Sequence, residues 1–163
     1  MKKNRIVITL AFVLAFTAGL YAQSDKELTI KTARALETSP LAQDTVKMRE
    51  KALKWVIETD QVSVIVCGEI FSLFSDKKNK NSSEMTVAYT IGMAAFKLEF
   101  PEKASDENAA QLAGLETALK SYEAIVKEKP KTNSYKEQKE RASRLRKLRT
   151  AVTRLEAEIE ETE

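Results

Sequence analysis

The side chains with potential for chemistry gather around one apolar stretch, VSVIVCGEIFSLF (62–74). It contains Cys67, the only cysteine of the chain, and Glu58, Asp60 and Glu69 lie beside or within it. A reactive thiolate needs a nearby cation or imidazole to lower its pKa, and paired carboxylates suit general acid–base catalysis. The first question is therefore whether these residues form an active site.

The composition argues against catalysis. The chain has no histidine, which excludes serine–histidine and cysteine–histidine catalysis and removes the commonest ligand of zinc and copper. Acidic residues at helix starts usually stabilise the helix. We therefore predict a protein that is not an enzyme, with no catalytic residue, no metal ligand and no cofactor, and with a buried, unreactive Cys67. A carboxylate enzyme that uses Glu58, Asp60 and Glu69 is the alternative.

Residues 1–22 predict the compartment. Lys2, Lys3 and Arg5 precede an apolar run that ends in small residues at Ala22, the pattern of a secretory signal peptide. The run is shorter than the roughly 20 residues of a spanning helix, so we expect no stable membrane span after cleavage. Three of the 27 basic residues lie in this segment, and the others balance the 24 acidic residues. We predict a periplasmic or secreted protein that does not bind nucleic acid.

Scarce glycine and proline, with long stretches rich in Ala, Leu, Glu, Lys and Arg, predict an all-α chain. Pro40, Pro101 and Pro130 each follow a helix-like segment, where proline commonly marks a stop. The predicted fold is a single helical bundle of about five helices plus an extended, charged C-terminal helix. The predicted divisions are a signal peptide at 1–22, a helical domain at 23–131 and an amphipathic C-terminal helix at 132–163.

The stretch from Asp60 to Phe74 fits two structures. Val62, Val64 and Val66 alternate as in a strand, yet apolar residues also recur at helical spacing through Ile70. Because no partner strand is evident elsewhere, we predict a helix. Its almost wholly apolar character predicts that it is the most buried element.

Apolar stripes at helical spacing supply the core and any ligand groove. One stripe follows residues 85–100 and another follows residues 112–126, and the groove would lie between these two helices. Gly92 interrupts the first helix at a cost of about 1 kcal/mol, which a close approach of another helix backbone would offset. The candidates for a groove lining, which are equally core candidates, are Trp55, Tyr89, Met93, Phe96 and Tyr122.

The last helix, from about Ser134, carries its own apolar seam. The candidate interface residues are Leu145, Leu148, Val152, Leu155 and Ile159. Basic residues precede acidic ones along this helix, so an antiparallel second copy would set opposite charges together. The same basic block also fits a solvated, ion-paired helix face, which is our interpretation of KEQKERASRLRKLR.

Two stretches, WVIETDQVSVIVCGEI and YTIGMAAFKLEFPEKASDENAAQLAGLETALKSYEAIVKEKPK, resemble small secreted α-helical bacterial envelope proteins of unassigned function. This resemblance covers about residues 54–131 and implies an envelope protein without assigned catalytic residues. Ala118, Tyr122 and Pro130 also resemble the second helix of a tetratricopeptide repeat, although Ile125 stands where that pattern prefers alanine. The resemblance implies a degenerate helix pair.

These observations predict an exported, non-catalytic binding or adaptor protein of the bacterial envelope. Its helical bundle would offer a groove to a protein, a peptide or an apolar ligand, and the partner could be a second copy of the chain. The alternative is a structural or oligomerising protein that acts through a C-terminal coiled coil.

Overall fold

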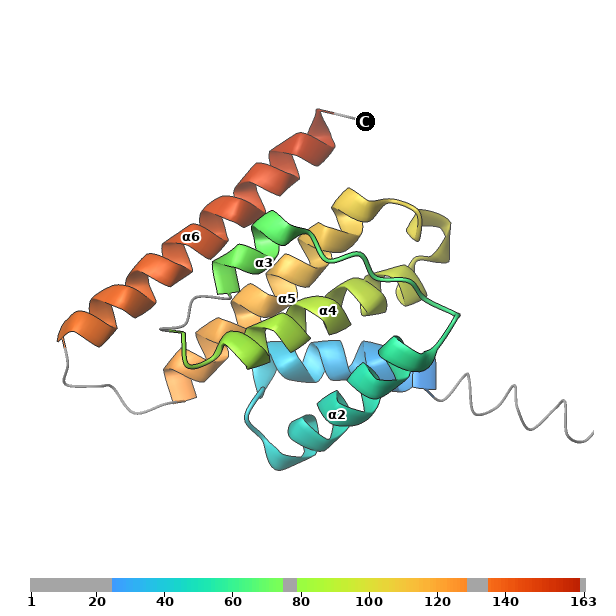
Figure 1. Ribbon diagram of the computed structural model, residues 1–163, viewed down its shortest axis with the longest axis horizontal. Coiled ribbons are helices and arrows are strands. Elements are labelled where there is room, and N and C mark those ends of the chain that lie inside the picture. Colours follow the sequence, from blue (N-terminus) through green and yellow to red (C-terminus); the bar gives the residue numbers. More distant parts are fainter. Residues whose placement is uncertain (1–24, 75–78, 129–134, 162–163) are drawn as a thin grey trace, which may run out of the picture.

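The computed structural model describes residues 25–74, 79–128 and 135–161, and all regular structure within these ranges is helical (Figure 1). The elements are an N-terminal helix (residues 25–38), α2 (Gln43–Glu58), α3 (Gly68–Phe74), α4 (Ser82–Glu99), the 3-10 helix η1 (Pro101–Lys103), α5 (Glu107–Glu128) and α6 (Tyr135–Glu160). The predicted all-α class is confirmed. The predicted signal peptide lies outside the described residues.

Most helix boundaries follow local signals. The N-terminal helix ends two residues before Pro40, and α4 ends two residues before Pro101. The carboxylate of Asp106 accepts a hydrogen bond from the backbone N–H of Ala109 at 2.9 Å, which caps the start of α5. Within the described ranges, no helix is both apolar enough and long enough to cross a membrane.

The hairpin of α4 and α5 forms the centre of the molecule (Figure 1). These two helices lie side by side between α6 and the pair formed by α2 and the N-terminal helix. A Cβ atom at Gly92 would lie 3.0 Å from the Cα atom of Gly114, so the two backbones approach closely there. This close approach is the packing that the sequence predicted as compensation for Gly92.

The prediction of one buried helix over residues 60–74 was wrong. Residues 59–67 form an extended segment, and only Gly68–Phe74 is helical. The run of β-branched residues disfavours a helix here, since such side chains lose rotamer freedom in a helix. The segment is also not the most buried element, because Ile65 is 57% exposed and Val66 is 41% exposed. The most buried element is α4, which has nine buried residues.

A buried lysine fixes the extended segment onto α4. The ammonium group of Lys97 donates hydrogen bonds to the carbonyl oxygen of Ser63 at 2.9 Å and to the carboxylate of Glu107 at 2.5 Å. The Lys97 side chain is only 5% exposed, and a charge so buried is tolerated because it has such partners. Lys97 therefore connects α4, the extended segment and the first turn of α5.

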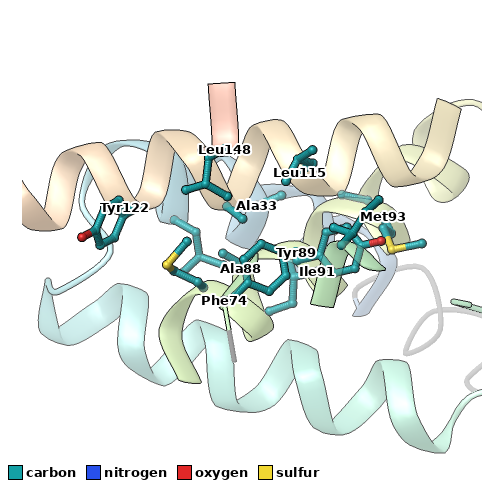
Figure 2. Close-up of a cluster of buried hydrophobic side chains, with 14 of the residues drawn as sticks. Ala33, Phe74, Ala88, Tyr89, Ile91, Met93, Leu115, Tyr122 and Leu148 are labelled. Atoms are coloured by element: carbon teal, nitrogen blue, oxygen red, sulfur yellow. The ribbon is translucent and has the colours of Figure 1, made fainter. Parts of the chain in front are cut away.

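The C-terminal helix α6 packs against the rest of the chain. Leu148 is fully buried and belongs to the same core cluster as Phe74, Tyr89 and Leu115, and Figure 2 shows it pointing into that cluster. The guanidinium of Arg149 donates two hydrogen bonds to Oε1 of Glu123 on α5, at 2.7 and 3.2 Å. The apolar side of α6 is thus used within the chain.

Candidate functional site

The five groove candidates do not gather in one groove. Tyr89, Met93 and Tyr122 are fully buried core residues, as Figure 2 shows. Trp55 packs against a second, smaller cluster that includes Val56. None of these four residues lines either of the two clefts described below.

The fifth candidate, Phe96, is half-buried and lines a small cleft over the contact between α4 and α5. This cleft has a volume of about 310 Å³, and Leu112 and Ile159 also line it. A groove between the helices of Met85 and Leu112 was predicted, and this cleft lies there in part. Because this cleft is small and its floor at Gly92 is closely packed, it is a weaker candidate for a ligand site than the larger cleft described next.

The larger cleft lies between α3 and α6 and has a volume of about 600 Å³. Its apolar floor comes from Ile70 and Leu73 of α3 and from Ala151 and Leu155 of α6. Figure 1 shows α3 lying beside α6. A volume of this size is typical of small-molecule sites, which are mostly apolar with a few placed polar groups.

Charged side chains surround this floor. The lining holds three cations, Arg146, Lys147 and Arg154, and two carboxylates, Glu69 and Glu158. Arg154 donates a hydrogen bond to Glu158 at 2.7 Å, and this contact together with the charge of Glu69 raises the pKa of Arg154 further above its usual value. Arg146 and Lys147 form no ion pair with any described residue.

Two rows on α6 place these groups over the cleft. Residues four apart lie on one helix face, and all members of both rows line the cleft. The first row is Ser143, Lys147, Ala151 and Leu155. The second row, beside the first, is Arg146, Thr150, Arg154 and Glu158. Sequence reasoning assigned the basic block to a solvated face, and Arg146, Lys147 and Arg154 are exposed as expected, but it did not identify the cleft that they line. The four-residue spacing of Arg146, Thr150 and Arg154 was the available signal.

Cys67 also lines the cleft. Its thiol is free and half-buried, so the prediction of a buried cysteine was wrong. The extended segment brings this residue to the start of α3, where it lines the cleft and also packs against the core cluster. Because Cys67 is the only cysteine of the chain, a thiol reagent would modify the protein at this cleft alone.

The three carboxylates suspected of catalysis are dispersed. Glu58 ends α2 and lies 3.9 Å from Lys54, Asp60 lies in the extended segment, and Glu69 begins α3. All three are exposed. Within the ranges that the structure describes, no cluster of three or more Cys, Asp or Glu residues is placed to hold a metal ion.

The candidate interface of α6 faces inward. Leu148 is buried, and Leu145, Val152 and Leu155 are half-buried against the core cluster, while Ile159 lines the smaller cleft. The five residues therefore lie in intramolecular contacts or beside clefts. A coiled-coil partner would have to displace these contacts.

Two buried tyrosines differ in hydrogen bonding. The hydroxyl of Tyr122 accepts a hydrogen bond from Nη1 of Arg144 at 3.1 Å. The hydroxyl of Tyr89 has no partner of ordinary hydrogen-bond geometry in the described part of the chain. Burial is the main reason that the pKa of Tyr89 is raised to about 12; the backbone of Cys67 opposes this shift, and charge interactions with Cys67 and Glu107 add to it.

Removing the two hydroxyls should therefore affect stability differently. We expect Tyr89→Phe to leave the free energy of unfolding unchanged or to raise it by about 1 kcal/mol, because a buried hydroxyl without a well-formed hydrogen bond is costly. Tyr122→Phe loses a hydrogen bond from a charged donor and should lower it by about 1 kcal/mol. Urea unfolding of both variants measures the difference. A greater loss in Tyr89→Phe would contradict the assignment.

The raised pKa of Tyr89 makes the stability of the protein depend on pH. A tyrosine in the unfolded chain ionises near pH 10.0, whereas folded Tyr89 stays neutral until about pH 12. Its contribution to stability is therefore complete below pH 10.0 and is lost as the pH rises to about 12. The wild type should lose more stability over this window than Tyr89→Phe does. Equal losses in the two proteins would refute this origin.

Comparison of the chain with known protein families, with characterised proteins and with solved structures found no match.

Proposed function

We propose that this chain is an exported, non-catalytic binding protein of the bacterial envelope, and that its ligand is an anionic amphiphile held in the cleft between α3 and α6. One observation carries the proposal: an apolar floor lies beside two cations, Arg146 and Lys147, that no described residue neutralises. The export part rests on the signal pattern in residues 1–22.

The floor favours a hydrocarbon chain. Ile70, Leu73 and Leu155 present aliphatic side chains to a cleft of about 600 Å³. Removing apolar surface from water is worth roughly 25 cal/mol per Å², so a bound alkyl chain gains most of its affinity there. Asn108 and Gln111 of α5 add polar groups at the same cleft.

The charges favour an anionic head group. Arg154 already has a carboxylate partner in Glu158, which leaves Arg146 and Lys147 for a ligand. A guanidinium can donate two hydrogen bonds to one carboxylate, and such charge-assisted bonds are stronger than neutral ones. With three cations against two carboxylates in the lining, an anion is preferred over a cation.

The packing of α6 favours this function over a C-terminal coiled coil. Leu148 and its neighbours already bury their apolar side chains within the chain. The antiparallel hairpin of α4 and α5 is compatible with the tetratricopeptide-like pattern, and we keep that relation, like envelope location, as part of the proposal.

Titration calorimetry with dodecanoate tests the proposal. We expect saturable binding of one dodecanoate to the chain from Gln23 to Glu163. The double variant Arg146→Gln, Lys147→Gln should bind it about tenfold more weakly, a loss of about 1.4 kcal/mol. The matched control, Lys51→Gln with Lys54→Gln on α2, makes the same charge change away from the cleft and should bind as the wild type does.

A probe with the opposite charge separates the two halves of the proposal. Dodecyltrimethylammonium has the same alkyl chain, and we expect it to bind more weakly than dodecanoate. Equal affinity for both probes would refute the role of the cations. An absence of binding by both would refute the cleft as a ligand site.

A further inference from the structure

We infer, on the basis of the proposed function, that the cleft between α3 and α6 binds its ligand in one direction and selects an alkyl chain of about ten to twelve carbons. The anionic head group lies beside Arg146 and Lys147, and the methyl end of the chain lies beside Leu155. The charges at the two ends of the cleft set the direction, and the length of its apolar floor sets the chain length.

The two ends of the cleft differ in charge. At the near end, the charged side chains of the lining are Arg146 and Lys147. At the far end, Arg154 donates a hydrogen bond to the carboxylate of Glu158 at 2.7 Å. The other carboxylate of the lining, Glu69 of α3, also belongs to the far end, because its charge contributes to the raised pKa of Arg154. An anionic head group is therefore attracted to the near end and repelled by two carboxylates at the far end.

The neighbouring helices follow the same direction. Figure 1 shows α5 and α6 running antiparallel, and Arg149 bonds to the Glu123 carboxylate at 2.7 Å where the middle of α6 passes the second half of α5. The end of α6 therefore lies beside the start of α5, where Asn108 and Gln111 line the cleft. The helix α3 also runs opposite to α6, which sets its last turn, with Leu73, toward the near end. The far end is thus polar as well as acidic.

The apolar floor has a limited length. Lys147 and Leu155 belong to the same row on α6 and are eight residues apart, so about 12 Å of helix separates them at a rise of about 1.5 Å per residue. With C–C bonds of about 1.5 Å, an extended alkyl chain advances about 1.25 Å per carbon, so about ten carbons span this distance. Ala151 lies between the two residues and keeps the row apolar. Beyond Leu155 the lining of α6 continues with Glu158, so further CH₂ groups gain no apolar contact.

Titration calorimetry with a series of alkanoates tests the chain length in the protein from Gln23 to Glu163. The probes are octanoate, decanoate, dodecanoate, tetradecanoate and hexadecanoate, each below its critical micelle concentration. Up to dodecanoate, we expect the affinity to rise about two- to fourfold with each added CH₂ group, because each group leaves water for the apolar floor. Tetradecanoate and hexadecanoate should bind less than about twofold more tightly than dodecanoate, since their last carbons extend beyond Leu155.

Dodecanedioate tests the direction of binding. It has the length of dodecanoate, but its second carboxylate would lie at the far end beside Glu69 and Glu158. We expect it to bind at least about tenfold more weakly than dodecanoate, because like charges repel and the second carboxylate loses water. The monomethyl ester of dodecanedioate is the matched control. Its far end is neutral, so it should bind more tightly than the diacid does.

Leu155→Ala tests which part of the floor holds the end of the chain. Octanoate ends before Leu155 when its carboxylate lies at the near end, whereas dodecanoate reaches it. The ratio of dodecanoate affinity to octanoate affinity should therefore fall at least about threefold in this variant. Three results would overturn the inference: a rise in affinity that continues to hexadecanoate, dodecanedioate binding as tight as that of dodecanoate, or an equal loss of octanoate and dodecanoate affinity in Leu155→Ala. Each of these leaves dodecanoate bound and the proposed function standing, whereas a wild type that does not bind dodecanoate would overturn both.

Discussion

Gly114→Ala is expected to lower the free energy of unfolding by about 2 kcal/mol. An added Cβ atom would lie 2.7 Å from the carbonyl oxygen of Tyr89 and 2.5 Å from Cγ of Met93. The carbonyl belongs to the backbone of α4, so the two central helices must separate. Alanine gains about 1 kcal/mol in helix propensity, but this gain is smaller than the cost of overpacking a close helix contact.

Gly68→Ala is the matched control for this effect. Gly68 begins α3, no atom lies within 4 Å of a Cβ added there, and its φ is not positive. Its substitution should leave stability unchanged or raise it slightly, because the unfolded chain becomes less flexible. Urea unfolding followed by circular dichroism compares the two variants. Equal stability of the two would show that α4 and α5 do not touch at Gly114.

Leu148→Ala is expected to lower the free energy of unfolding by about 3 kcal/mol. Leu148 is fully buried among core side chains, so its truncation leaves a cavity beneath α6. Leu41→Ala, the same truncation at an exposed site, should change stability by less than about 0.5 kcal/mol. Thermal and urea unfolding measure both. If Leu148→Ala behaves like Leu41→Ala, α6 does not pack on the core as described.

Local patterns were sufficient for much of the fold. The apolar stripe through Tyr89 and Met93 identified the helix that forms α4, and proline identified the ends of helices. Gly92 was interpreted correctly because glycine inside a helix has a known cost that only close packing offsets. These predictions concern contacts between residues near in sequence, or a single strong physical constraint.

The extended segment was missed because its structure depends on distant residues. Lys97 lies 34 positions after Ser63, and its buried ammonium is the group that bonds the Ser63 carbonyl. Nothing in the alternation of Val62, Val64 and Val66 reveals that contact. The absence of a partner strand favours a helix in the sequence, whereas a single extended segment can rest on a helix without a partner.

The cleft was missed because it depends on which elements meet. Arg146 and Lys147 are exposed surface residues, and they line a cleft only because α3 lies across from α6. Likewise, Cys67 lies in an apolar run that suggests burial, yet it is half-buried and lines the cleft. The position of a helix on a domain surface is a tertiary property that periodicity alone does not determine.

The most direct test of the proposed binding function is the rate at which a thiol reagent modifies Cys67 as dodecanoate is added. Cys67 is the only thiol of the chain and lines the cleft, so the rate reports on that site alone. We predict a saturable slowing of the reaction whose midpoint equals the dissociation constant from calorimetry. A rate that stays constant while calorimetry shows dodecanoate bound would place the ligand elsewhere and contradict the account.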